Sequence, residues 1–351
     1  MKLDTKPTRH APVSVRERPE RVARLATLLP GLGVASTVAA MAIVLSQLID
    51  VKELKPLLLA VILGIAWRQV WVPPAYCRPG IRFSMRWVLR LAVVLLGLRL
   101  SMSDVLTSGV MGLAIVTVST LSTFYFTCWL GRRLRIHRQL VQLIAAGTSV
   151  CGASAIVAAN AVVEGSEEDV TYAVATITGF GTLAILAYPL LATMFDFSSS
   201  TFGLWCGASI HEVAQVVATA FQHGTTSGEL ATLTKLTRVL LLVPIVIGLG
   251  VQRKGERSSV RVQDRALPIP WFVLFFCGCV ILNSLNIIPA GIKQALLVSN
   301  QGLLCLALAA MGLETNIGLI KQLGLKPIYL AGMSWAFLAG LSLSLITLLG
   351  V

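Results

Sequence analysis

Long apolar runs separated by short polar or charged segments fill the chain from about residue 26 to its C-terminus. A helix that spans a membrane needs roughly 20 apolar residues, and eleven runs come near that length. Several contain Gly or Pro, which lipid tolerates only where neighbouring helices or a cavity satisfy the freed backbone groups. The pattern predicts an all-α, polytopic membrane protein with about eleven transmembrane helices. The runs are 26–49, 56–72, 85–101, 108–131, 139–163, 170–195, 201–221, 229–250, 270–289, 296–313 and 327–349.

The composition supports the same class of protein. Hydrophobic residues make up 56% of the 351 residues and charged residues only 13%, with a mean hydropathy of +0.80. A soluble domain carries about 25% charged residues. We expect a basic, disordered cytoplasmic tail at 1–25 and a single transmembrane domain at 26–351, which includes a basic cytoplasmic loop at about 252–268.

The net charge of +13 is concentrated in loops. If the N-terminus is cytoplasmic and eleven spans alternate, the inside segments hold 22 of the 29 Lys and Arg residues, and the acidic loop 164–169 lies outside. Cytoplasmic loops of membrane proteins carry such an excess of positive charge. The charge therefore indicates topology in a bacterial inner membrane, with the N-terminus cytoplasmic and the C-terminus periplasmic, rather than nucleic-acid binding.

Two cations lie inside an apolar run, which is unusual. Lys235 and Arg238 fall within 230–250, and their spacing of three places them on one helical face. A cation at the centre of a membrane helix costs about 2.5–3.5 kcal/mol on insertion scales, so it usually faces a partner or a substrate path. The pair predicts an internal site for an anion.

Two stretches rich in small and hydroxyl residues lie near the midpoints of their runs, at 147–154 and 207–214. Such stretches suit either close helix packing or two broken helices, whose free N–H groups at mid-membrane favour an anion. We take the second interpretation. Counting spans makes the stretches parallel, which conflicts with a simple inverted pair and leaves their relative direction open. The expected binding residues are Gly147, Thr148, Ser149, Cys151, Gly152, Ser154, Gly207 and Ser209.

A polar trio overlaps the end of the second stretch. His211, Glu212 and Gln215 resemble the start of a zinc-protease H-E-x-x-H motif, but Gln215 stands where the second His should be, so no metal site is expected. A buried carboxyl group favours its protonated form. We expect the trio to bind a coupling proton or sodium ion. The alternative is a satisfied polar contact that holds helices together.

A weak internal repeat relates 88–109 to 303–324, including Gly97 with Gly312 and Gly109 with Gly324. The runs that contain these segments are seven apart in the order of spans, an odd number, so the copies would run in opposite directions. Inverted repeats are a common construction of secondary transporters, and we expect one here.

Four segments resemble a known family: LRLAVVLLGLRLS (89–101), GTSVCGASAIVAAN (147–160), GASIHEVAQVVATA (207–220) and TKLTRVLLLVP (234–244). They are similar to the YeiH-type inner-membrane proteins of bacteria, often labelled sulfate exporters. That family is similar to a superfamily of sodium/proton antiporters and bile-acid symporters. The resemblance implies inverted repeats, crossed broken helices and a homodimer.

These observations predict a secondary transporter for a small anion of the sulfate or sulfonate class. Lys235 and Arg238 would neutralise the anion, and a proton or sodium gradient would drive the cycle. The chain has no GxxxxGK[ST] motif, so ATP-driven pumping is not expected, and no cofactor is implied. The alternatives are an anion channel or uniporter, and a membrane enzyme that uses His211 and Glu212.

Overall fold

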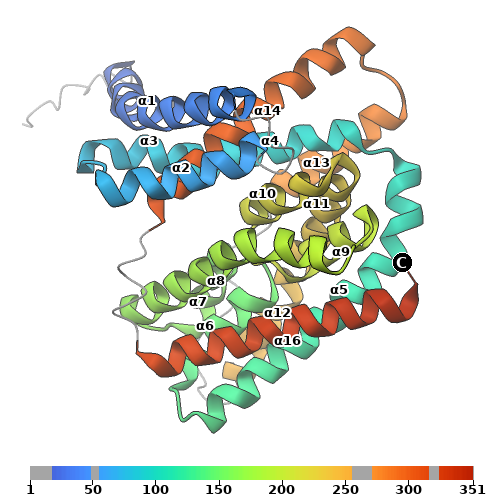
Figure 1. The fold of residues 1–351 in the computed structure, drawn as a ribbon. Coiled ribbons are helices and arrows are strands. Elements are labelled where there is room, and N and C mark those ends of the chain that lie inside the picture. Colours follow the sequence, from blue (N-terminus) through green and yellow to red (C-terminus); the bar gives the residue numbers. More distant parts are fainter. Residues whose placement is uncertain (1–17, 49–54, 255–270, 316–323, 351) are drawn as a thin grey trace, which may run out of the picture.

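The computed structural model describes residues 18–48, 55–254, 271–315 and 324–350, and within these ranges its secondary structure is helical, without a β-strand. The predicted all-α class is confirmed. The helices, labelled as in Figure 1, are α1 (Arg18–Leu48), α2 (Pro56–Val70), α3 (Arg78–Phe83), α4 (Leu89–Leu96), α5 (Met102–Arg133), α6 (Arg138–Ser149), α7 (Ala153–Val163), α8 (Glu167–Met194), α9 (Ser199–Ser209), α10 (Val213–His223), α11 (Thr225–Leu240), α12 (Leu242–Lys254), α13 (Trp271–Ser284), α14 (Ala290–Glu314) and α16 (Leu325–Leu349). Two short 3-10 helices, η1 (Ala75–Cys77) and η3 (Gly97–Arg99), and a π-helical segment, η2 (Ser84–Val88), connect or extend α3 and α4.

The membrane class follows from six helices that are long and apolar enough to cross a bilayer. These are Thr27–Leu48, Gly112–Arg133, Glu167–Met194, Thr225–Val251, Ala290–Glu314 and Leu325–Leu349. The structure does not support the predicted count of eleven crossings. The inverted repeat also stays a prediction, because 316–323 in its second copy lies outside the described residues.

The predicted tail and the predicted basic loop are only partly described. Helix α1 begins at Arg18, inside the segment 1–25 that we expected to be a disordered tail. Residues 1–17 lie outside the described ranges. Helix α12 extends to Lys254, and 255–270, most of the predicted loop, also lies outside them.

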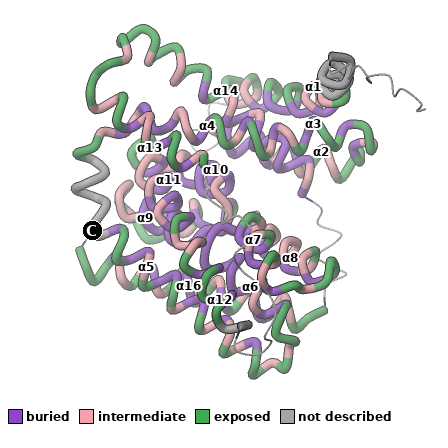
Figure 2. The backbone as a smooth tube through the Cα atoms, turned by 180° about the vertical axis from the view of Figure 1, so that it is seen from behind, coloured by how far each residue is buried: buried purple, intermediate pink, exposed green. Residues whose placement is uncertain are grey.

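The helices form two layers (Figure 1). In the smaller layer, α1, α2, α3, α4 and α14 pack together, and α14 lies along α2. There a Cβ built on Gly64 would lie 2.9 Å from the Cα of Gly312, so only glycine permits this approach of two backbones. The larger layer contains α5 to α12 and α16. Its buried residues concentrate where α9, α10 and α11 meet the other helices (Figure 2).

Helices α6 and α7 form a hairpin, which we call hairpin 1, rather than one broken transmembrane helix. A Cβ on Gly147 would lie 2.8 Å from Cγ1 of Ile156 across the turn, and Nε2 of His137 lies 2.6 Å from Oδ1 of Asp169 beyond its open end. The chain therefore turns back on itself at 150–152. With 12 residues, α6 is about 18 Å long, roughly half of the hydrocarbon thickness.

Helices α9 and α10 form hairpin 2 in the same way. Each has 11 residues, and the turn between them is 210–212. At the open end, His223 Nε2 lies 3.0 Å from the carbonyl oxygen of Phe197, and the rings of Phe202 and His223 are 4.9 Å apart. Both ends of this hairpin therefore lie beside the C-terminal end of α8.

The two hairpins enter the bundle from opposite ends of α8. Hairpin 1 opens beside Asp169 in the first turn of α8, and hairpin 2 opens beside Phe197 just after its last turn. This corrects one expectation, because segments 132–138 and 164–169 lie on the same side of the bundle rather than on opposite sides. The two Gly/Ser-rich stretches, whose relative direction the sequence left open, approach each other from opposite directions.

Candidate functional site

The turns of the two hairpins meet in the middle of the larger layer. A Cβ built on Gly152, in the turn of hairpin 1, would lie 2.7 Å from Cγ of Glu212, in the turn of hairpin 2. Helix α11 passes beside both turns and carries Lys235 and Arg238, each fully buried. Both turns and both cations were predicted as site residues, and the structure brings them together.

Lys235 connects the two turns directly. Its Nζ donates to the carbonyl oxygen of Val150 at 2.7 Å and to that of Ile210 at 2.8 Å. Arg238 does the same from the next turn of α11: its Nε donates to Ser149 O at 2.6 Å and its Nη1 to Ile210 O at 2.9 Å. Its Nη2 donates to the carbonyl oxygen of Thr148.

These contacts explain why two cations are stable at full burial. The last carbonyl groups of a helix have no partner within it, and the helix dipole places partial negative charge there. Helices α6 and α9 both end at the turns, so Lys235 and Arg238 neutralise two converging C-terminal ends. A buried charge that lacked such partners would be strongly destabilising.

Glu212 occupies the opposite kind of helix end. Its carboxylate caps α10, where it accepts from the backbone N–H of Gln215, and it also accepts from the backbone of Ala153 at the start of α7. Thr178 Oγ1 on α8 donates to its Oε1 at 3.1 Å. A carboxylate is favoured there because both helix N-termini carry partial positive charge.

Gln215 fixes the second turn against α8. Its Oε1 accepts from the backbone N–H of Glu212 at 3.2 Å, and its Nε2 lies 3.4 Å from the carbonyl oxygen of Thr178. A Cβ on Gly181 would lie 1.9 Å from the same amide oxygen, so only glycine leaves room for it. In this structure Gln215 is a positioning residue for Glu212.

His211 is the most unusual member of the site. It is fully buried, and neither ring nitrogen has a hydrogen-bond partner. Thr148 Oγ1, in the last turn of α6, is also buried without a partner. Buried polar atoms almost always have a partner, so these two side chains could accept one from a ligand or a water molecule. Among the described residues, no group of three or more His, Cys, Asp or Glu side chains could hold a metal ion.

The other predicted binding residues have local roles. Gly147 packs against Ile156 within hairpin 1, and a Cβ on Gly207 would lie 2.5 Å from the carbonyl oxygen of Ala231, where α9 crosses α11. Their small size serves the helix packing that we had considered as the alternative. Hydroxyl and thiol contacts are also local: Ser149 donates to Ala145 O, Ser209 to Trp205 O, and Cys151 Sγ lies 3.0 Å from Ser154 Oγ.

Sequence reasoning missed two residues on α8 that contact hairpin 2. Thr178 binds Glu212, and the buried Tyr188 donates from its hydroxyl to Ser209 Oγ at 2.8 Å. The ring of Tyr188 also stacks on Trp205, with centroids 3.9 Å apart. A lone Thr or Tyr within an apolar helix carries no signal in the sequence, so only the fold reveals them.

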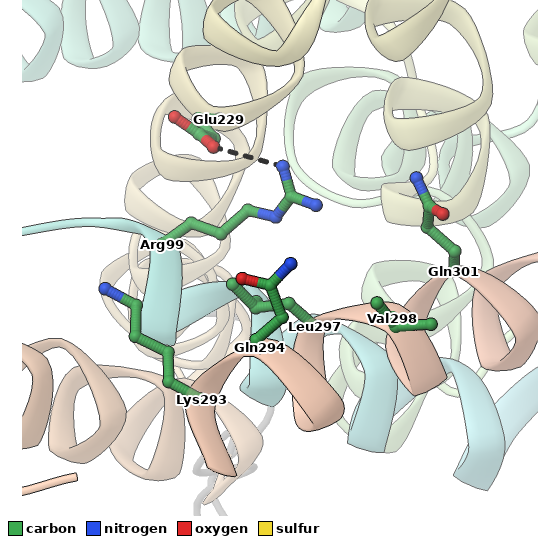
Figure 3. Close-up of a pocket in the computed structure, with 7 residues that line it drawn as sticks. All are labelled: Arg99, Glu229, Lys293, Gln294, Leu297, Val298 and Gln301. Atoms are coloured by element: carbon green, nitrogen blue, oxygen red, sulfur yellow. Dashed lines mark ion pairs between the residues drawn. The ribbon is translucent and has the colours of Figure 1, made fainter. Parts of the chain in front are cut away.

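A cavity of about 360 Å³ lies between the two layers (Figure 3). Arg99 reaches it from η3 and Glu229 from α11, and they form an ion pair of 3.6 Å. Nε of Arg99 is buried without a hydrogen-bond partner. Glu229 precedes Lys235 by six residues on α11, a rise of about 9 Å. The remaining lining residues come from α14 and are Lys293, Gln294, Leu297, Val298 and Gln301.

Comparison with known proteins gives one consistent group of relatives. Residues 30–331 match the family model described as "Conserved hypothetical protein 698". A UPF0324 membrane protein of Yersinia pestis is 36% identical over 346 residues, covering 93% of this chain and 95% of that protein. The UPF0324 inner membrane protein YeiH of Escherichia coli K12 is 34% identical over 287 residues, covering 80% and 82%. No solved structure matches the chain.

Proposed function

Because the chain belongs to the YeiH-type UPF0324 family of bacterial membrane proteins, we propose that it is a secondary transporter that moves a small anion across the cytoplasmic membrane. The anion belongs to the sulfate or sulfonate class, and a proton or sodium gradient drives its movement. One observation carries this proposal. Two hairpins, each about half a membrane long, enter from opposite sides and meet at a buried centre with one more cation than carboxylate.

This arrangement favours alternating access over the rival functions. Hairpins that reach the centre from both sides can each open toward one side while the other stays closed, as transporters with discontinuous helices require. The Gly152–Glu212 contact closes the centre in this state, which favours binding and release over the free conduction of a channel. An enzyme would need reaction partners for His211 and Glu212, whereas Glu212 instead caps two helices.

The cavity at Arg99 suits the approach of an anion. Arg99 and Lys293 place two cations against Glu229, and Gln294 and Gln301 add amide donors. We place the entrance from one side of the membrane here, because α11 connects the cavity with Lys235. The cavity also lies between the layers, where a movement of one layer against the other would change its shape.

The proposal includes a topology with nine crossings. If the two hairpins do not cross, α1, α2, the α3–η3 segment, α5, α8, α11–α12, α13, α14 and α16 remain as crossings. Nine is odd, so the N-terminus stays cytoplasmic and the C-terminus periplasmic. Compared with eleven alternating spans, this topology moves two segments, 164–169 and 196–200, to the other side of the membrane. Neither segment contains Lys or Arg. The positive-inside pattern is therefore unchanged. A homodimer completes the proposal.

Flux measurements in proteoliposomes test the function. Purified protein should accumulate labelled sulfate or a small sulfonate when a proton or sodium gradient is imposed, and liposomes without protein should not. Lys235→Ala should abolish this flux, whereas Lys55→Ala, at a half-buried cation that bonds Phe221 O at 3.0 Å, should retain it. If no gradient changes the wild-type flux, the protein is a uniporter or a channel.

A further inference from the structure

A cluster of backbone carbonyl groups surrounds Lys235 and Arg238. Helix α6 contributes the carbonyl oxygens of Thr148 and Ser149, and the two turns contribute those of Val150 and Ile210. The four oxygens come from two separate hairpins, yet they converge on one short stretch of α11. Such convergence of partial negative charge requires a cation.

In many secondary transporters, the cation at such a place is an ion from solution. Unwound backbone and the C-terminal ends of half-helices coordinate Na⁺ there, while N-terminal ends face the anionic substrate. Carbonyl oxygens are also the ligands that hard cations prefer. In this chain, the oxygens instead accept hydrogen bonds from an ammonium and a guanidinium group, both fully buried.

We infer that Lys235 and Arg238 permanently take the place of a bound alkali cation, so that the transport cycle requires no sodium. This inference rests on the proposed function and narrows its driving ion. The side chains belong to the chain and cannot leave the protein, so they supply positive charge to these oxygens without carrying a cation across the membrane. A sodium ion would have to compete with two fixed positive charges for the same oxygens.

Replacing sodium in the flux assay tests the inference in the wild-type protein. Anion flux should be unchanged when N-methylglucamine replaces sodium on both sides, and an imposed sodium gradient should not drive accumulation. Flux that requires sodium would overturn the inference but leave the proposed anion transport standing. Absence of anion flux under every gradient would instead overturn the proposed function.

A binding measurement that needs no transport tests the same site. Sodium should not raise the Tm of the wild-type protein in detergent beyond the effect of equal N-methylglucamine chloride, because a ligand that binds the folded state raises its stability. Lys235→Ala removes the ammonium from the oxygens of Val150 and Ile210. Sodium should raise the Tm of this variant, and N-methylglucamine should not.

Lys55→Ala is the matched control. Lys55 also donates to a carbonyl group near a helix C-terminus, that of Phe221, but among the described residues this is its one backbone partner, and it remains partly exposed. Its removal should create no response to sodium. A sodium-raised Tm in the wild type, or an equal sodium response in Lys55→Ala and Lys235→Ala, would overturn the inference. So would a folded Lys235→Ala protein that ignores sodium.

Discussion

At the scale of single residues, three ionisable side chains balance four helix ends. Lys235 and Arg238 neutralise the C-terminal ends of α6 and α9, and Glu212 neutralises the N-terminal ends of α7 and α10. Each charge was visible in the sequence, because an ionisable residue in an apolar run needs a partner. Most of their partners were not visible, because these are backbone groups that any residue type supplies.

Arg238→Lys should impair the protein although it keeps the charge. The guanidinium group donates to three carbonyl groups, those of Thr148, Ser149 and Ile210. An ammonium group is a compact charge that cannot reproduce this planar arrangement. Loss of one or two charged hydrogen bonds should lower stability by about 2–4 kcal/mol, which thermal unfolding of the purified variant would show as a lower Tm. A wild-type Tm together with normal flux would contradict this role.

Glu212→Gln should separate anion binding from the proton gradient. The amide keeps the size of the carboxylate and its oxygen can still accept from Thr178, but it cannot take up or release a proton. We expect this variant to bind the anion while its flux no longer follows an imposed pH gradient. If the flux of Glu212→Gln depends on the pH gradient as strongly as the flux of the wild type, then Glu212 only caps the two helices.

At the scale of helices, the sequence predicted where the breaks occur but not how the chain continues after them. The apolar run 139–163 is long enough for one span. Two short helices folded back on each other have the same length and the same hydropathy. The contacts that distinguish the two arrangements, such as His137 with Asp169, join residues on either side of the run, and periodicity contains no information about them.

Gly152→Ala should disrupt the meeting point of the hairpins. Gly152 has φ 70° and ψ −133°, a conformation that residues with a Cβ rarely adopt and that costs them about 1–3 kcal/mol. The added methyl group would also lie 2.7 Å from Cγ of Glu212. We expect a lower Tm and little flux. Gly248→Ala is the control, since nothing lies within 4 Å of a Cβ there. If both variants have the same Tm and flux, the turn does not require glycine at position 152.

At the scale of the whole molecule, the charge distribution predicts an orientation with which the positions of the helix ends are compatible. Arg82 and Glu314 pair at 3.2 Å at one end of the bundle, and Arg99 pairs with Glu229 at the opposite end. Helix α1 begins at one end, and α16 finishes at the other (Figure 1). Counting charges could assign a side to each basic loop, but it could not place 164–169, because that segment has no Lys or Arg.

Cysteine labelling distinguishes the nine-crossing topology from eleven alternating spans. Gln139, Glu168 and Thr226 are exposed in the first turns of α6, α8 and α11, and each can be changed to Cys in a background that lacks the native cysteines. The hairpin arrangement places positions 139 and 168 on the same side, and position 226 on the other. Eleven alternating spans would instead place positions 168 and 226 together. A membrane-impermeant maleimide added to intact cells should therefore label only Thr226→Cys, and it should label all three after permeabilisation.

A reporter fused after Val351 should be periplasmic. Labelling of Glu168→Cys in intact cells would refute hairpin 1 as a re-entrant element, and a cytoplasmic reporter would refute an odd number of crossings.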